Sequence, residues 1–110
     1  MTKMPADQIQ AVAFEIIISA GDGRTKVHEA IQEMRKGNFT EAEAILEDAN
    51  DSFVTAHKAQ TSMLQEYAGG TEITMEIIFV HAQDHLMTGM LYKDMAEDML
   101  ELYKRLDAIE

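Results

Sequence analysis

Cysteine and tryptophan are absent from this sequence of 110 residues, and proline occurs only once, at Pro5. Without cysteine the chain cannot form a disulfide framework, a thiolate metal site or a cysteine nucleophile. With one proline near its start, almost nothing along the chain interrupts helix formation. No apolar run approaches the roughly 20 residues that cross a bilayer. The opening stretch MTKMPADQIQ lacks the basic segment and apolar core of a secretory signal, so we expect a cytoplasmic protein without direct membrane insertion.

Positive charge is also scarce. Nine lysines and arginines stand against 20 aspartates and glutamates, which gives a formal net charge of −11. Nucleic acid and anionic membranes would repel such a chain, so we expect neither as a partner, whereas basic protein surfaces would attract it. Hydrophobic residues make up 46% of the chain and charged residues 26%, a balance typical of globular proteins. The length predicts a single domain over residues 1–110.

The apolar residues follow helical spacing in three long segments. Steps of three and four predict helices over residues 6–36 and 40–68, and a third helix from Thr71 or Thr74 nearly to Glu110. Short connections make neighbouring helices antiparallel. The predicted fold class is therefore all-α: an antiparallel up-down-up three-helix bundle.

The first connection carries recognisable helix-end signals. Gly37 suits the left-handed conformation that ends many helices. Thr40 and Glu43 match a capping box, with Phe39 in the position of a hydrophobic staple. We therefore expect Thr40 to cap the second helix.

The third segment is unusual because residues 77–92 contain no lysine, arginine or glutamate. Apolar side chains go around the helix there, with Leu86 on one side and Val80 and Met87 on another. A lone three-helix bundle cannot cover all of these faces, so we expect a second subunit to bury one of them. The predicted core stripe of this helix comprises Ile78, His81, His85, Thr88, Tyr92, Met95, Met99, Leu102, Leu106 and Ile109.

Three polar residues lie within this apolar stretch. His81, Asp84 and His85 have the spacing that places side chains on one face of a helix. Burying all three is costly unless they are paired or bind a ligand. The His-x-x-x-His spacing suits a metal site, and a neutral imidazole is also a competent nucleophile. Spacing alone does not choose between these two chemistries.

The string VHAQDHLMT resembles the active-site segment of the IIA component of the lactose/cellobiose (also diacetylchitobiose) branch of the bacterial sugar phosphotransferase system. The resemblance extends over nearly the whole chain, through AGDGRTKVHEAI, GNFTEAEAILEDAN, AHKAQT and ELYKRL. Gly23 is a departure, since relatives more often carry alanine there. As a glycine inside a helix, it is expected to cost up to ~1 kcal/mol relative to alanine.

The resemblance implies a homotrimer of three-helix subunits that acts as a phosphocarrier. His81 would accept a phosphoryl group from phospho-HPr and pass it to a cysteine of the cognate IIB component, for uptake of a β-linked disaccharide. His85 and Gln83 would stabilise the phosphoryl group, with Gln83 pointing toward a neighbouring subunit. The resemblance further implies Mg²⁺, one ion per trimer at the Asp84 cluster. No arginine is nearby in the sequence.

An alternative function from another class stays open. It is a non-catalytic helical assembly module with a metal site at Asp84 and His85. A hydrolytic metalloenzyme would also need an open metal position and a general base, and the sequence supplies neither. The sequence does not identify the sugar, the phosphorylated ring nitrogen or a need for the metal in the cell.

Other residues of the first two helices have less specific interpretations. Gln60 lies on an apolar stripe, which suits a buried hydrogen bond. His57 and Lys58 are as readily explained by a solvated face. Gly21 and Gly23 suit a close helix contact, a wall of the phosphoryl pocket or a local kink.

Overall fold

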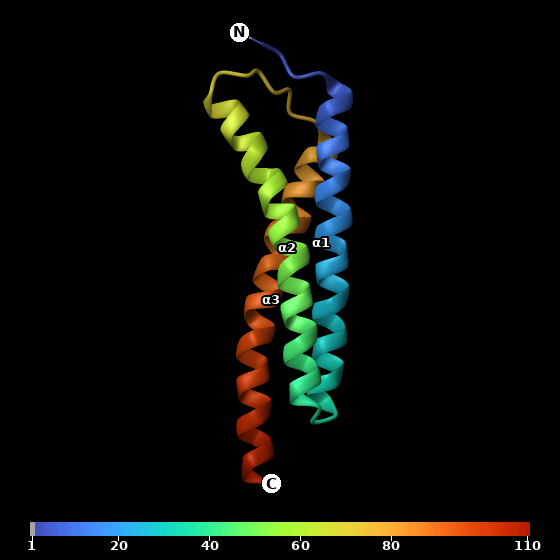
Figure 1. Ribbon diagram of the computed structural model, residues 1–110, viewed down its shortest axis with the longest axis vertical. Coiled ribbons are helices and arrows are strands. Elements are labelled where there is room, and N and C mark those ends of the chain that lie inside the picture. Colours follow the sequence, from blue (N-terminus) through green and yellow to red (C-terminus); the bar gives the residue numbers. More distant parts are fainter. Residues whose placement is uncertain (1) are drawn as a thin grey trace.

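The computed structural model describes residues 2–110 as a bundle of three long helices (Figure 1). They are α1 (Ala6–Arg35), α2 (Phe39–Ala68) and α3 (Ile77–Ile109). Consecutive helices are antiparallel: in Figure 1, α1 runs downward, α2 runs upward and α3 runs downward again. The C-terminal end of α3 extends past the connection between α1 and α2. The expected all-α fold and its topology are confirmed. Within residues 2–110, no helix is long and apolar enough to cross a membrane.

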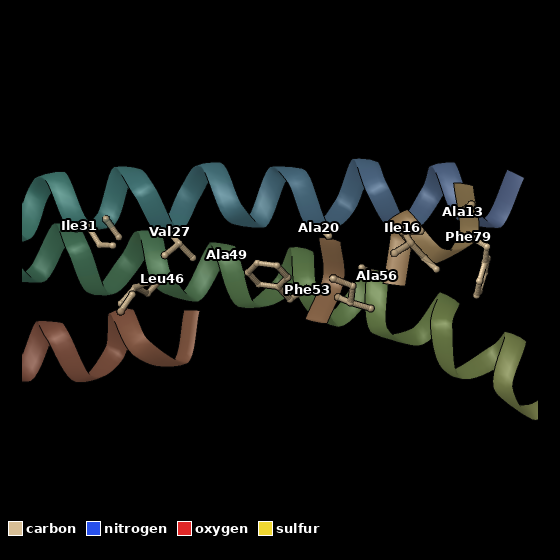
Figure 2. Packing of buried hydrophobic residues seen from close by; sticks show 14 of the residues in the cluster. Ala13, Ile16, Ala20, Val27, Ile31, Leu46, Ala49, Phe53, Ala56 and Phe79 are labelled. Carbon is tan, nitrogen blue, oxygen red and sulfur yellow. The ribbon is translucent and has the colours of Figure 1, made fainter. Parts of the chain in front are cut away.

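The first helix is the centre of the bundle. It packs along both of the others, while α2 and α3 share far fewer contacts. Alanines without exposed surface line the contacts between the helices and let their backbones approach closely (Figure 2). They are Ala13, Ala20 and Ala30 on α1, Ala42, Ala49 and Ala56 on α2, and Ala82 and Ala96 on α3.

One aromatic ring joins all three helices. Phe53 of α2 is buried between two glycine backbones, Gly23 of α1 and Gly89 of α3. A Cβ atom built at Gly23 would lie 2.8 Å from the ring, and one at Gly89 would lie 2.6 Å from it. Real Cβ atoms do not approach so closely. The expectation that Gly23 makes the fold less stable than alanine would is therefore wrong, because the packing leaves no room for a methyl group.

Replacement of Gly23 by alanine is accordingly expected to destabilise the fold. Overpacking a dense core costs about 1–3 kcal/mol, which outweighs the gain in helix propensity. Gly21→Ala is the matched control, since a Cβ there would meet its nearest neighbour, His85 Nε2, at an ordinary 3.4 Å. Urea denaturation at equal protomer concentration measures both. A Gly23→Ala variant as stable as Gly21→Ala would contradict this account.

Both α1 and α2 end in the same way. Gly37 has a φ of 80°, its amide donates to the Met34 carbonyl at 3.0 Å, and the next amide donates to the Glu33 carbonyl at 3.0 Å. Gly70, with a φ of 102°, repeats the pattern after α2. These bonds satisfy carbonyls that a helix end otherwise leaves free. The predicted role of Gly37 is confirmed.

The predicted helix starts are wrong at both connections. The N-cap of α2 is Asn38 and makes no side-chain cap bond, so Phe39 and Thr40 lie inside the first turn and form neither a staple nor a capping box. The tight turn at Gly37 leads directly into the helix, and the Asn38 side chain instead donates to Glu33 Oε2 at 2.7 Å. The N-cap of α2 therefore lies two residues earlier than the predicted cap, Thr40.

The third helix begins later than predicted, at Ile77 rather than at Thr71 or Thr74. The chain before it pairs with the N-terminal segment: the Met4 amide donates to the Glu72 carbonyl at 2.9 Å, in a parallel bridge. Those backbone groups are therefore used outside the helix. As a result, His81 lies in the second turn of α3, close to its N-terminal end.

The buried residues of α1 and α2 largely follow the predicted steps of three and four, but the buried face of α3 differs from its predicted stripe. Its predicted stripe includes His81, Thr88 and Leu102, which are exposed. The buried positions are Phe79, Ala82, Leu86, Gly89, Ala96 and Leu100. Because apolar residues surround the first half of α3, periodicity does not select one face. The small residues at Ala82, Gly89 and Ala96 fit against α1, and packing therefore decides the orientation.

Candidate functional site

Two histidines of α3 lie together on the side of the helix that faces α1. The ring centroids of His81 and His85 are 5.8 Å apart and their planes differ by 19°. His81 is exposed, whereas His85 is half-buried with its Nε2 atom against Gly21 of α1. Glycine at position 21 thus lets α1 approach the His85 ring. The predicted common face is confirmed for His81 and His85, but not for Asp84, which lies on the exposed face of α3 beside it.

The environment of His85 favours its neutral form. Its pKa is lowered from the usual value, first by burial and then by the positive charges of Arg24 and His81, while the Asp84 carboxylate acts in the opposite direction. Burial disfavours the charged imidazolium, and a nearby guanidinium disfavours it further. At neutral pH His85 therefore offers one N–H donor and one acceptor nitrogen beside His81.

Arg24 is a neighbour of the histidines that the sequence did not reveal. It comes from α1 and donates from Nη1 to Thr88 Oγ1 at 2.7 Å and to the His85 carbonyl at 3.4 Å. Gly89 leaves a path for its aliphatic stem, since a Cβ there would lie 3.1 Å from Arg24 Cγ. An arginine thus lies near the site in space although none is near in sequence. The signal was its position three residues after Gly21, on the same flank of α1.

Gln83 lies on the other flank of α3. Two residues along a helix turn the chain by about 200°, so its side chain points away from His81 of the same chain. The amide nitrogen Nε2 of Gln60 in α2 donates to Gln83 Oε1. Gln60 is buried, which confirms the hydrogen-bonding role expected for it. The structure therefore brings His81 and His85 together but keeps Gln83 of the same chain apart from them.

Asp84 lies among exposed apolar side chains on the face of α3 opposite the core. Val80, Met87 and Leu91 around it are each more than half exposed, at 52%, 57% and 62%. We call the exposed apolar residues of this face the outer stripe: Ile77, Val80, Met87, Leu91, Met95, Leu102, Leu106 and Ile109. The expectation that one bundle leaves a face of α3 uncovered is confirmed. The homotrimer stays a prediction.

A single chain does not assemble a metal centre. Residues 2–110 contain no group of three or more histidine, cysteine, aspartate or glutamate side chains that could hold an ion. Asp84 is exposed and turned toward solvent, so a metal there would need side chains from further copies. His57 and Lys58 are exposed on α2, in agreement with the solvated-face interpretation.

Comparison with known proteins agrees with the fold and identifies the family. Residues 11–104 match the family model described as PTS system, Lactose/Cellobiose specific IIA subunit. A lactose-specific EIIA component of Staphylococcus epidermidis is 43% identical over 102 residues, which cover 93% of this chain and 98% of that protein.

Solved structures give the same result. The crystal structure of PtcA from S. mutans superposes with a TM-score of 0.91 at 55% identity and covers 92% of this chain and 99% of that one. The IIA(Chitobiose) protein in its HPr complex, from the Escherichia coli phosphotransferase system, has a TM-score of 0.77 at 27% identity and covers 90% and 96%. The chain therefore belongs to the lactose/cellobiose-specific IIA family of the sugar phosphotransferase system.

Proposed function

We propose that this protein is a phosphocarrier that accepts a phosphoryl group from phospho-HPr on His81 and transfers it to a cysteine of the cognate IIB component. The sugar would be a β-linked disaccharide of the lactose, cellobiose or chitobiose type. The observation that carries the proposal is an exposed His81 stacked on a half-buried His85 in the second turn of α3. The HPr complex of the chitobiose relative supports the donor.

The chemistry is an in-line exchange of bonds at phosphorus. A lone pair on a ring nitrogen of His81 forms the new nitrogen–phosphorus bond while the bond from phosphorus to HPr breaks, and the electron pair of that bond leaves with HPr. In the second step the thiolate of IIB attacks and the His81 nitrogen departs. Such transfers depend on positioning and electrostatics, and the positive end of α3 favours the incoming negative charge.

The outer stripe supports assembly around a three-fold axis. If three α3 helices meet along it, the α1 flank of one subunit faces the α2 flank of the next, since such contacts are heterologous. His81 and His85 lie on the first flank and Gln83 on the second. Each phosphoryl site would then combine two histidines of one subunit with Gln83 of its neighbour. His85 and Gln83 would donate hydrogen bonds to the phosphoryl oxygens.

Asp84 would lie near the axis of this trimer. Three carboxylates gathered among apolar side chains repel one another unless a cation neutralises them. The exposed Asp84 carboxylate, which lies among the outer-stripe residues, could bind this cation, because Mg²⁺ prefers hard oxygen ligands. We therefore propose one Mg²⁺ per trimer at Asp84. When bound, the ion would supply charge neutralisation between the subunits.

Replacement of Asp84 by leucine is expected to leave the trimer intact, and to make it independent of divalent metal. Leucine continues the outer stripe and removes the repulsion between carboxylates. Sedimentation of the wild-type and Asp84→Leu proteins, with and without a chelator, measures this. The wild type should dissociate more readily in chelator than the variant. A variant that falls to monomers would count against the axial position of Asp84.

Phosphorylation of the purified protein tests the proposed function. Incubation with phosphoenolpyruvate, the general phosphotransferase enzyme and HPr should add ~80 Da to the intact mass, in an acid-labile form. Fragmentation that preserves the N–P bond should place the added mass on His81. Absence of the gain would favour the alternative, a non-catalytic assembly module, since the outer stripe supports assembly under either function.

A further inference from the structure

The only buried polar side chain among residues 2–110 belongs to Gln60. It lies in α2 at 7% exposure, between residues that pack in the apolar core. Burying a carboxamide costs free energy unless its groups find partners. Its amide nitrogen donates to Gln83 Oε1 and lies 3.9 Å from Met87 Sδ. Gln83 lies on the flank of α3 that faces α2, and Met87 lies where that flank meets the outer stripe.

The two partners fix the polarity of this contact. A pair of carboxamides can hydrogen-bond either way, with each one as the donor. A thioether sulfur accepts hydrogen bonds but never donates them. Because Met87 Sδ lies beside the same nitrogen, the Gln60 amide group is held with its NH₂ toward α3. Gln83 must then turn its oxygen inward, and its own NH₂ is left free to face away from the bundle.

We propose that Gln60 is a positioning residue of the phosphoryl-transfer site, which holds the Gln83 carboxamide with its NH₂ group outward for the phosphoryl group of the adjacent subunit. This inference rests on the proposed function. A carboxamide that rotates freely presents its oxygen as readily as its nitrogen, and an oxygen repels the phosphoryl dianion. A fixed donor costs no reorganisation when the charge arrives. As a neutral donor, it also binds the group less tightly than an arginine, which suits onward transfer.

Single-turnover transfer from phospho-HPr tests this role. Gln60→Met keeps the length of the side chain but removes the donor, and should slow phosphorylation of His81 about tenfold, less than the loss of a catalytic donor. Gln60→Glu keeps the shape but replaces the donor by an acceptor, so it should slow transfer at least as much. Met63→Leu, a buried substitution one turn along α2 without this hydrogen bond, should leave the rate unchanged.

A double-mutant cycle separates positioning from structural damage. If Gln60 acts through Gln83, Gln60→Met should cause no further loss of rate in a Gln83→Met protein. A loss that persists there would overturn the inference, as would wild-type rates in both Gln60 variants. Failure of the wild-type protein to accept phosphate would instead contradict the proposed function itself.

The direction of the hydrogen bond between Gln60 and Gln83 can also be tested in the wild-type protein. In amide NMR spectra, the side-chain NH₂ protons of Gln60 should exchange slowly with solvent, because they are buried and hydrogen-bonded, whereas those of Gln83 should exchange fast. The opposite assignment would show that Gln83 is the donor and that its oxygen faces outward. That result would also overturn the inference.

Discussion

Replacement of His81 by alanine is expected to abolish phosphorylation of this protein by phospho-HPr. The ring nitrogen of His81 is the proposed acceptor, and alanine offers no nucleophile at that position. Its neighbour His85 is half-buried with Nε2 against Gly21, so it does not reach the exposed position of His81. The intact mass after incubation should therefore show no gain of ~80 Da.

Two further histidine variants serve as controls for this result. His85→Ala should still gain the mass but more slowly, by roughly ten- to a hundredfold, since it removes a neutral donor beside the phosphoryl group. His57→Ala, exposed on α2, should behave as the wild type. Full phosphorylation of His81→Ala, or loss of all phosphorylation only in His85→Ala, would contradict the proposal that His81 is the phosphoryl carrier.

The course of the three helices was predictable because glycines mark their ends and apolar spacing is regular in the first two. Gly37 ends α1 by the mechanism its residue type predicts. The start of α3 was not predictable, because it depends on the pairing of Glu72 with the N-terminal segment, which is far away in the sequence. Local capping signals at Thr71 and Thr74 carry no information about such a contact.

The orientation of α3 shows a second limit of periodicity. In residues 77–92 an apolar side chain is available on every side, so several stripes fit the sequence equally well. The choice between them depends on volume: Ala82 and Gly89 allow close approach to α1, while larger residues remain on the outer stripe. Excess apolar surface was therefore predictable, but not which face of the helix carries it.

The site was predictable where it is local and not where it spans helices. His81 and His85 are one turn apart, and helical geometry alone places them together. Arg24 reaches Thr88 from another helix, and Gln60 reaches Gln83 in the same way. Neither contact follows from spacing, because both depend on how far the helices slide along each other.

Replacement of Phe53 by alanine is expected to cost about 3–5 kcal/mol of unfolding free energy. The ring contacts the backbones of Gly23 and Gly89 on either side. Neither glycine has a side chain that can move into the space left by the ring, and the surrounding helices can only partly collapse. The loss should therefore lie near the upper end of that range. Urea denaturation at one fixed protomer concentration measures it, since assembly contributes to stability.

The effect of Gly89→Ala on the free energy of unfolding should have opposite signs in the wild type and in the Phe53→Ala variant. In the wild type the added methyl group overlaps the Phe53 ring and should destabilise by about 1–3 kcal/mol. In Phe53→Ala the ring no longer opposes the methyl group, and the close neighbour that remains is the flexible stem of Arg24, whose Cγ would lie 3.1 Å from the added Cβ. The stem can shift, so the gain in helix propensity should prevail and stabilise by up to ~1 kcal/mol. At an open position of a helix, alanine in place of glycine stabilises the fold. If Gly89→Ala stabilises the wild type in this way, the packing of the Phe53 ring against Gly89 is refuted.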